Sequence, residues 1–236
     1  MAELLREIPA RVLAVYAHPD DPDVSCGGAL ARWAKQGAEV HVVIVTRGDK
    51  GTTDPDVDPD ALARRRLAEA GEAAAVLGLS GQYVLDHRDG ELVDDLELRG
   101  ELVSWIRRLK PDTVLCPDPT AVFFGEDYFN HRDHRVVGFA ALDALAPAAS
   151  LPQYFPEAGP AHHVDSALLS GTLEPTVWVD VTDTIEAKAA AVACHRSQFA
   201  DDGEWARDAV LRRAEEDGRR AGVPFAEGFR RLRLTG

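Results

Sequence analysis

Short apolar runs alternate along the chain with longer segments in which apolar residues recur at helical spacing. Strands are predicted at the apolar runs, over residues 11–17, 39–46, 82–85, 113–116 and 178–181. Helices are predicted over residues 26–36, 59–77, 96–109, a segment near His134, 183–198 and 205–221. Apolar runs without polar interruption are typical of parallel strands that are buried on both faces. The alternation therefore predicts an α/β fold whose sheet is mostly parallel.

Segments rich in Gly, Asp and Pro separate these elements and predict loops. The first predicted loop covers residues 48–60. The second is a long loop over residues 117–130 that leads into the helix near His134, and the third is an irregular segment over residues 146–165. The chain shows no internal repeat, no linker composition and no low-complexity tract. We therefore expect a single domain over residues 1–236.

Composition and charge narrow the classes of function. The formal net charge of −14 argues against a general binder of nucleic acids or anionic membranes, because both surfaces would repel the protein. No apolar run approaches the ~20 residues needed to span a bilayer, and the first residues lack the pattern of a signal peptide. The three cysteines have no CxxC spacing, so neither a disulfide framework nor a cysteine zinc site is expected. A cytoplasmic enzyme of small-molecule metabolism is the expectation.

Two histidine motifs follow predicted strands. His18-Pro19-Asp20-Asp21 comes directly after the first strand, and His131-Arg132-Asp133-His134 comes after the strand at 113–116 and its loop. Ligands of such sheets bind outside the carboxyl ends of the strands. We therefore expect the two motifs to meet in one crevice.

The residue types in these motifs suit a catalytic metal ion. A zinc hydrolase uses three protein ligands, commonly His and carboxylate, and leaves one position open. His18 and Asp21 are three residues apart and can face one centre, and His134 can supply the third ligand. If a helix begins near residue 133, His131 lies on the same face as His134. The motifs then contain more polar groups than the metal needs, and the surplus groups can serve as acid and base.

The sequence resembles the PIG-L or LmbE-like deacetylase family, which has an AHPDD motif after its first strand and a later HxDH motif. Here these motifs read Ala17-His18-Pro19-Asp20-Asp21 and His131-Arg132-Asp133-His134, the latter preceded by Asn130. Other segments are also similar to the family, namely Thr46-Arg47-Gly48-Asp49, Arg66 with Glu69, Asp89-Gly90, Lys188 and His195-Arg196-Ser197-Gln198. The resemblance implies a three-layer, Rossmann-like sheet with helices on both faces.

The resemblance also implies an activity, which is the metal-dependent hydrolysis of a linear, non-peptide N-acyl amide. The substrate would be a small, glucosamine-like molecule that carries an N-acetyl group, with no nucleic acid or membrane involved. One Zn²⁺ per chain is expected, with Fe²⁺ as an alternative ion, and homo-oligomer formation stays open.

Each motif residue then has an expected role. His18, Asp21 and His134 would hold the metal. Asp20 would be the general base toward the attacking water, His131 would stabilise the oxyanion or protonate the leaving amine, and Asp133 would orient its neighbours. Arg66 and Asp89 would contact substrate.

Several readings stay open at this point. The same two-His, one-carboxylate set can bind Fe(II) for oxygen chemistry, and the protein can also be a catalytically silent sugar-binding α/β protein. Arg66 can be an exposed helix arginine, and Asp89-Gly90 can be only a turn. Pro22 stands where the family commonly has Glu, and Tyr128 is a candidate for an additional oxyanion donor.

Overall fold

The computed structural model describes residues 3–126, 128–199 and 204–234. Within these residues the main sheet has the strand order β1–β9–β10–β8–β5–β2–β3–β4. All neighbouring strands pair in parallel except β10, which is antiparallel to β8 and β9. The strands are β1 (Glu3–Leu4), β2 (Arg11–Tyr16), β3 (Glu39–Thr46), β4 (Gly81–His87), β5 (Thr113–Pro117), β8 (Ser166–Ser170), β9 (Val177–Asp180) and β10 (Ala226–Arg233).

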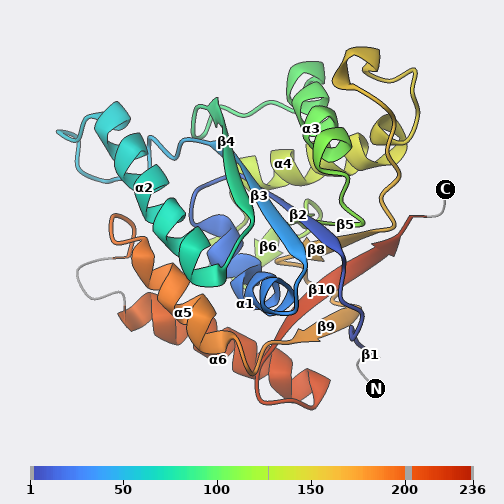
Figure 1. Ribbon diagram of the computed structural model, residues 1–236. Helices are drawn as coiled ribbons and strands as arrows, with labels where there is room; N and C mark the ends of the chain where they lie inside the picture. Colours follow the sequence, from blue (N-terminus) through green and yellow to red (C-terminus); the bar gives the residue numbers. More distant parts are fainter. Residues whose placement is uncertain (1–2, 127, 200–203, 235–236) are drawn as a thin grey trace.

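Helices cover both faces of this sheet (Figure 1). In the central strand β2, Ala14 and Tyr16 join one apolar cluster while Leu13 and Val15 join the other. The first cluster includes side chains of α1 (Asp21–Lys35), α2 (Pro59–Leu77), α5 (Ile185–Cys194) and α6 (Glu204–Ala221). The second includes side chains of α3 (Leu96–Leu109), α4 (Arg132–Asp143) and the π-helical segment Ala144–Ala149. The predicted α/β fold with a mostly parallel sheet between two helical layers is confirmed.

Helices α2 and α3 have the predicted bounds because local signals define their ends. The Asp58 carboxylate accepts a hydrogen bond from the Asp60 N–H, and Gly78 closes α2 in the left-handed region at φ 71°. Asp95 caps α3 by accepting from the Leu98 N–H. None of the helices among the described residues is both long and apolar enough to cross a membrane.

Other boundaries differ from the predictions. Strands β8 and β10 were not predicted, and the expected loop at 117–130 contains a small hairpin of β6 (Phe123–Phe124) and β7 (Tyr128–Phe129). β8 is a five-residue run inside a segment of irregular composition, and β10 carries arginines in an alternating pattern near the sheet edge. Tertiary pairing rather than local propensity stabilises both strands.

Helix α1 begins at Asp21, five residues before the predicted start. Pro22 lies in its first turn, where no intrahelical partner for a backbone N–H is required. This position accommodates the proline that replaces the glutamate common in the family. The predicted helix over 183–198 ends early, at Cys194, because the following His195 turns into the interior and pairs with Asp23.

A buried ion pair supports a kink in α1. Cys26 has non-helical dihedral angles, and Gly28 and Ala29 follow it on the far side of the kink. The Glu227 carboxylate of β10 accepts from both N–H groups at 3.0 and 2.8 Å, and Lys188 donates to the same carboxylate at 2.5 Å. A Cβ at position 28 would lie 3.0 Å from this carboxylate, so glycine permits the close approach. The pair therefore fixes the part of α1 that follows the kink relative to β10 and α5.

We expect Glu227→Gln to lower the free energy of unfolding by about 3–5 kcal/mol, since removing one partner leaves a buried Lys188 ammonium uncompensated. Urea denaturation followed by circular dichroism measures the loss. Glu216→Gln is the control, because Glu216 pairs with Arg220 on the exposed face of α6 and should change stability by less than ~1 kcal/mol. Equal stabilities of the two variants would contradict the role of the buried pair.

Candidate metal centre and active site

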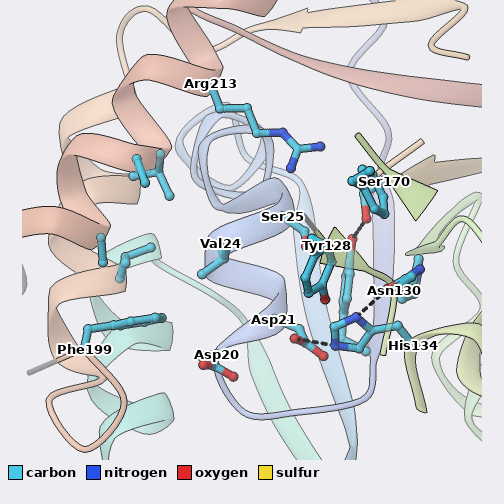
Figure 2. Close-up of a pocket in the computed structure, with 18 of the residues that line it drawn as sticks. Asp20, Asp21, Val24, Ser25, Tyr128, Asn130, His134, Ser170, Phe199 and Arg213 are labelled. Atoms are coloured by element: carbon cyan, nitrogen blue, oxygen red, sulfur yellow. Dashed lines mark hydrogen bonds and ion pairs between the residues drawn. The ribbon is translucent and has the colours of Figure 1, made fainter. Parts of the chain in front are cut away.

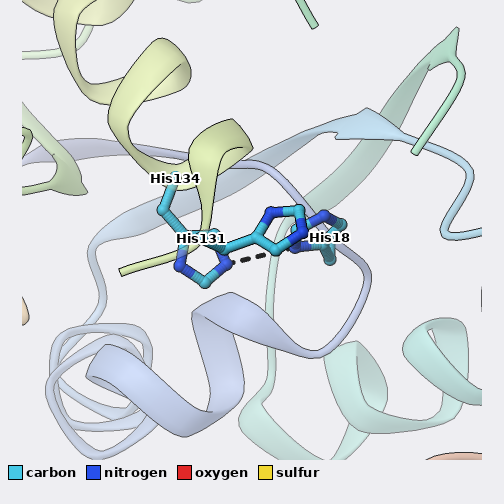
Figure 3. A group of neighbouring side chains, drawn as sticks. All are labelled: His18, His131 and His134. Atoms are coloured by element: carbon cyan, nitrogen blue, oxygen red, sulfur yellow. Dashed lines mark hydrogen bonds between the residues drawn. The ribbon is translucent and has the colours of Figure 1, made fainter. Parts of the chain in front are cut away.

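The two histidine motifs converge at the carboxyl ends of β2 and β5. His18 follows β2, Asp21 opens α1, His131 is the N-cap of α4 and His134 lies in its first turn. The ring centroid of His18 lies 4.9 Å from that of His131 and 5.1 Å from that of His134. Figure 3 shows the three imidazoles facing one another. The crevice expected from the sequence is thus present.

Donor atoms of three residues, which we call the triangle, lie at distances that suit a metal ion. His18 Nδ1 lies 3.1 Å from His134 Nε2 and 3.2 Å from Asp21 Oδ2, and His134 Nε2 lies 3.1 Å from Asp21 Oδ1. A tetrahedral zinc with bonds of about 2.0 Å separates its ligand atoms by roughly 3.3 Å. The residues present therefore fit a divalent cation with one open position.

Asn130 orients His134 toward this triangle. The Asn130 amide nitrogen donates to the Ala121 carbonyl at 3.0 Å. The other end of the amide, which lies 2.9 Å from His134 Nδ1, is therefore the oxygen and accepts a hydrogen bond. His134 therefore carries its proton on Nδ1 and directs the lone pair of Nε2 to the triangle. A partner on the second ring nitrogen is typical of metal-binding histidines. The sequence analysis gave Asn130 no role, although its place in the family motif is a signal for one.

Two carboxylates face the other nitrogen of His18. Nε2 lies 3.2 Å from Asp89 Oδ1 and 3.6 Å from Asp133 Oδ2. It makes no hydrogen bond with either carboxylate or with any other described residue. The Gly90 N–H donates to Asp133 Oδ2 at 2.6 Å. Asp89-Gly90 is thus part of the site as well as a turn.

Two other groups also bring possible ligand atoms within 4.8 Å of one another. They are His18 with His131 and His134, and His18 with Asp89 and Asp133. The triangle of His18, Asp21 and His134 combines two imidazoles with a carboxylate at contacts of 3.1 to 3.2 Å, and we take it as the candidate ligand set.

The charges of Asp21, His18 and His134 shift one another's pKa values. Burial alone would lower the pKa of His18 and of His134, but the Asp21 carboxylate outweighs this effect and raises both. Burial would likewise raise the pKa of Asp21, but His134 and His18 lower it well below its usual range. The Asp21 carboxylate thus favours positive charge on the two imidazoles, which is the charge that a bound cation would also supply.

Asp20 has a separate environment. Its carboxylate makes no capping bond to α1, and its Oδ1 accepts from Arg66 Nη2 at 2.9 Å. Arg66 is 3 % exposed, so the alternative of an exposed helix arginine is wrong. Arg66 also donates to the Gly48 carbonyl at 3.0 Å, and a Cβ at Gly48, whose φ is 63°, would lie 2.5 Å from the guanidinium. Substrate contact by Arg66 and Asp89 stays a prediction.

His131 is exposed at the mouth of the site. Its Nδ1 accepts from the Asp133 N–H at 3.2 Å, so the proton of the neutral ring lies on Nε2. Partial burial and the neighbouring His18 lower the pKa of His131. A neutral ring at this position offers one N–H donor outside the triangle.

A cavity of about 560 Å³ extends from the metal centre (Figure 2). Asp20, Asp21 and His134 lie at one end, and Tyr128 is part of the wall. The remaining wall comes largely from α1, α5, α6 and the β6–β7 hairpin. The sequence analysis did not assign α6 to the site, because only the packing of this helix against α5 brings it there. His195 is fully buried against Asp23, at 2.7 Å, and does not line this cavity.

Comparisons with known proteins agree with this geometry. The chain is 36% identical over 225 residues to the diacetylchitobiose deacetylase of Thermococcus kodakarensis, which covers 93% of this chain and 82% of that protein. It is 30% identical to 1D-myo-inositol 2-acetamido-2-deoxy-alpha-D-glucopyranoside deacetylase 2 of Saccharopolyspora erythraea, over 82% of this chain and 85% of that one. Among solved structures, the N,N'-diacetylchitobiose deacetylase of Pyrococcus horikoshii superposes with a TM-score of 0.87 at 34% identity, covering 95% of this chain and 84% of the other.

A sequence model of the family described as PIG-L, GlcNAc-PI de-N-acetylase, matches residues 13–145. This range includes both histidine motifs and the helix that carries Arg66. The extension of one domain over residues 1–236 stays a prediction. The family resemblance is confirmed, and the chain belongs to the PIG-L family.

Proposed function

We propose that this protein is a zinc-dependent deacetylase that hydrolyses the N-acetyl amide of a small amino-sugar substrate. The observation that carries the proposal is the triangle of His18, Asp21 and His134 with a second carboxylate, Asp20, beside it. Family membership supports the reaction type, since the relatives named above are deacetylases of acetylated amino sugars.

Asp20 is proposed as the general base. A bound divalent cation would lower the pKa of a water molecule and polarise the amide carbonyl. Asp20 lines the cavity at its metal end and would accept the proton of the attacking water. Arg66 holds Asp20 Oδ1 and leaves Oδ2 without a described side-chain partner. The buried guanidinium therefore positions the base.

His131 is proposed to act on the developing charge of the substrate. Its Nε2–H points away from the Asp133 backbone and would donate to the carbonyl oxygen as negative charge builds there, an effect of roughly 3 kcal/mol for a well-placed donor. The leaving amine would take up the proton that Asp20 accepts from the attacking water, because the neutral His131 ring has no proton to give without becoming an imidazolate. Asp133 and Asp89 flank His18 and would orient it.

The nature of the donor set supports zinc. Two imidazoles and one carboxylate are a common catalytic zinc set, and Fe²⁺ suits the same ligands. The chain's own residues therefore favour a borderline cation over Mg²⁺ or Ca²⁺, which prefer oxygen ligands.

A substrate panel tests the proposal. Protein reconstituted with zinc should release free amine from N-acetylglucosamine conjugates, measured by an amine-reactive fluorophore. The two alternatives predict other results. An Fe(II) oxygenase would consume dioxygen with 2-oxoglutarate, and a silent sugar-binding protein would bind the conjugates without turnover under either metal.

We expect zinc to raise Tm more at pH 8 than at about pH 6. The raised pKa values of His18 and His134 stabilise the metal-free fold below the unfolded value of ~6.5, and this contribution is lost as pH rises through the folded values. Zinc needs the deprotonated imidazoles, so its binding strengthens over the same window. Differential scanning fluorimetry measures the shift, with Mg²⁺ as the control cation. An equal zinc-induced shift at both pH values would contradict this assignment.

A further inference from the structure

The cavity continues well beyond the metal centre. Its volume of about 560 Å³ is typical of a site for a whole drug-sized ligand, so a single acetamido sugar at the metal would occupy only part of it. Figure 2 shows Asp21 and His134 at one end, Val24 and Tyr128 along the walls, and Arg213 at the opposite end. The distal part is therefore available to the portion of a substrate that is attached to the sugar.

Aromatic side chains of two segments line this cavity. Phe124 and Tyr128 of the β6–β7 hairpin have ring centroids 5.7 Å apart, and Phe199 and Trp205, near the start of α6, have centroids 5.5 Å apart. All four line the cavity. Apolar side chains of Val24, Val192 and Val210 also line the cavity. These surfaces suit a ring or another apolar unit that packs against the aromatic side chains.

Arg213 adds a positive charge at the far end. Among the described residues that line the cavity it is the one side chain with a permanent positive charge. It makes no ion pair and no side-chain hydrogen bond with a described residue, whereas other α6 arginines such as Arg207 and Arg220 pair with glutamates. Asp217, one turn further along α6, accepts from the Gly228 N–H instead. The guanidinium is thus free to bind a ligand.

The charges of the cavity favour one orientation of an anionic ligand. Arg213 lies at the end of the cavity away from Asp20 and Asp21. Its guanidinium can bind an oxyanion there through two N–H groups.

We propose that Arg213 binds an oxyanion, a carboxylate or a phosphate, carried by the unit attached to the acetamido sugar. The substrate is then an anionic conjugate, with a ring or apolar unit between the sugar and the charge. This inference rests on the proposed function, because it assumes that the acetamido group lies at the metal centre.

Matched aryl glycosides test the inference. Three N-acetylglucosaminides with a para-carboxylate, a para-phosphate or a neutral para-carboxamide on the aryl ring are compared with the zinc-loaded enzyme. We expect kcat/KM to be about two- to fivefold higher for an anionic glycoside, with the difference in KM, as for an exposed ion pair. The anionic glycoside with the higher kcat/KM shows whether the site prefers a carboxylate or a phosphate.

Variants of α6 assign the effect to one side chain. Arg213→Gln should remove the preference and leave turnover of the carboxamide within twofold, and Arg213→Lys should retain part of it. Arg212→Gln is the matched control, because Arg212 is the exposed neighbour on the same helix and does not line the cavity. Equal kcat/KM for all three glycosides, or an equal effect of the two glutamine variants, would overturn the inference.

A binding measurement separates this inference from the proposed function. Absence of turnover on every glycoside would contradict the deacetylase proposal alone. Calorimetric titration of the three glycosides into metal-free protein then decides the role of Arg213. Tighter binding of an anionic glycoside that is lost in Arg213→Gln supports it, and equal dissociation constants for the three refute it.

Discussion

Asp21→Ala is expected to remove zinc from the protein and to reduce deacetylation to background. Asp21 places one carboxylate oxygen 3.2 Å from His18 Nδ1 and the other 3.1 Å from His134 Nε2, so its loss opens the ligand triangle. Its Oδ2 also accepts from the His18 N–H at 2.7 Å and so shapes the loop before α1. Outer partners of metal ligands typically change affinity 10–100-fold, so loss of a direct ligand should exceed ~100-fold. Metal analysis by mass spectrometry and titration with a zinc indicator measure the change.

Asp208→Ala is the control for this prediction, since Asp208 is exposed on α6 and belongs to none of the three candidate metal groups. It should keep one zinc per chain and full activity. Stoichiometric zinc in Asp21→Ala would reject the triangle and favour one of the two other groups, His18 with His131 and His134 or His18 with Asp89 and Asp133.

Asp20→Asn is expected to keep the metal and to lose about 10²–10⁴-fold in kcat, the usual contribution of a general base. The amide has the shape of the carboxylate but cannot take a proton from water. KM should change little, because Asp20 is not proposed to bind the sugar. Steady-state kinetics with a parallel metal analysis measure both quantities.

Two comparisons make the Asp20 result specific. Arg66→Lys keeps a positive charge near Asp20 but loses the planar contacts to Asp20 and Gly48, so its kcat should fall between those of wild type and Asp20→Asn. A kcat near wild type in Asp20→Asn, with zinc bound, would remove Asp20 from the mechanism.

Local patterns in the sequence were sufficient for most of the sheet and for the site motifs. The β-branched runs of β2 and β3 and the capped helix α2 have the predicted bounds within one residue, because period and capping depend on neighbours in sequence. The order of the strands places the two histidine motifs at the same edge. Residue type and spacing then indicate a metal, since few other sites need two imidazoles beside two carboxylates.

Tertiary structure alone decided how these groups work together. The antiparallel strand β10 and its Glu227, the burial of Arg66 against Asp20, and the wall that α6 adds to the cavity all depend on contacts between residues far apart in sequence. Periodicity carries no information about such contacts, because it describes which face of an element is apolar and not which element covers it. The motifs in the sequence therefore determined the chemistry at the metal end of the cavity. The packing of α6, which the sequence pattern does not indicate, placed Arg213 at the other end.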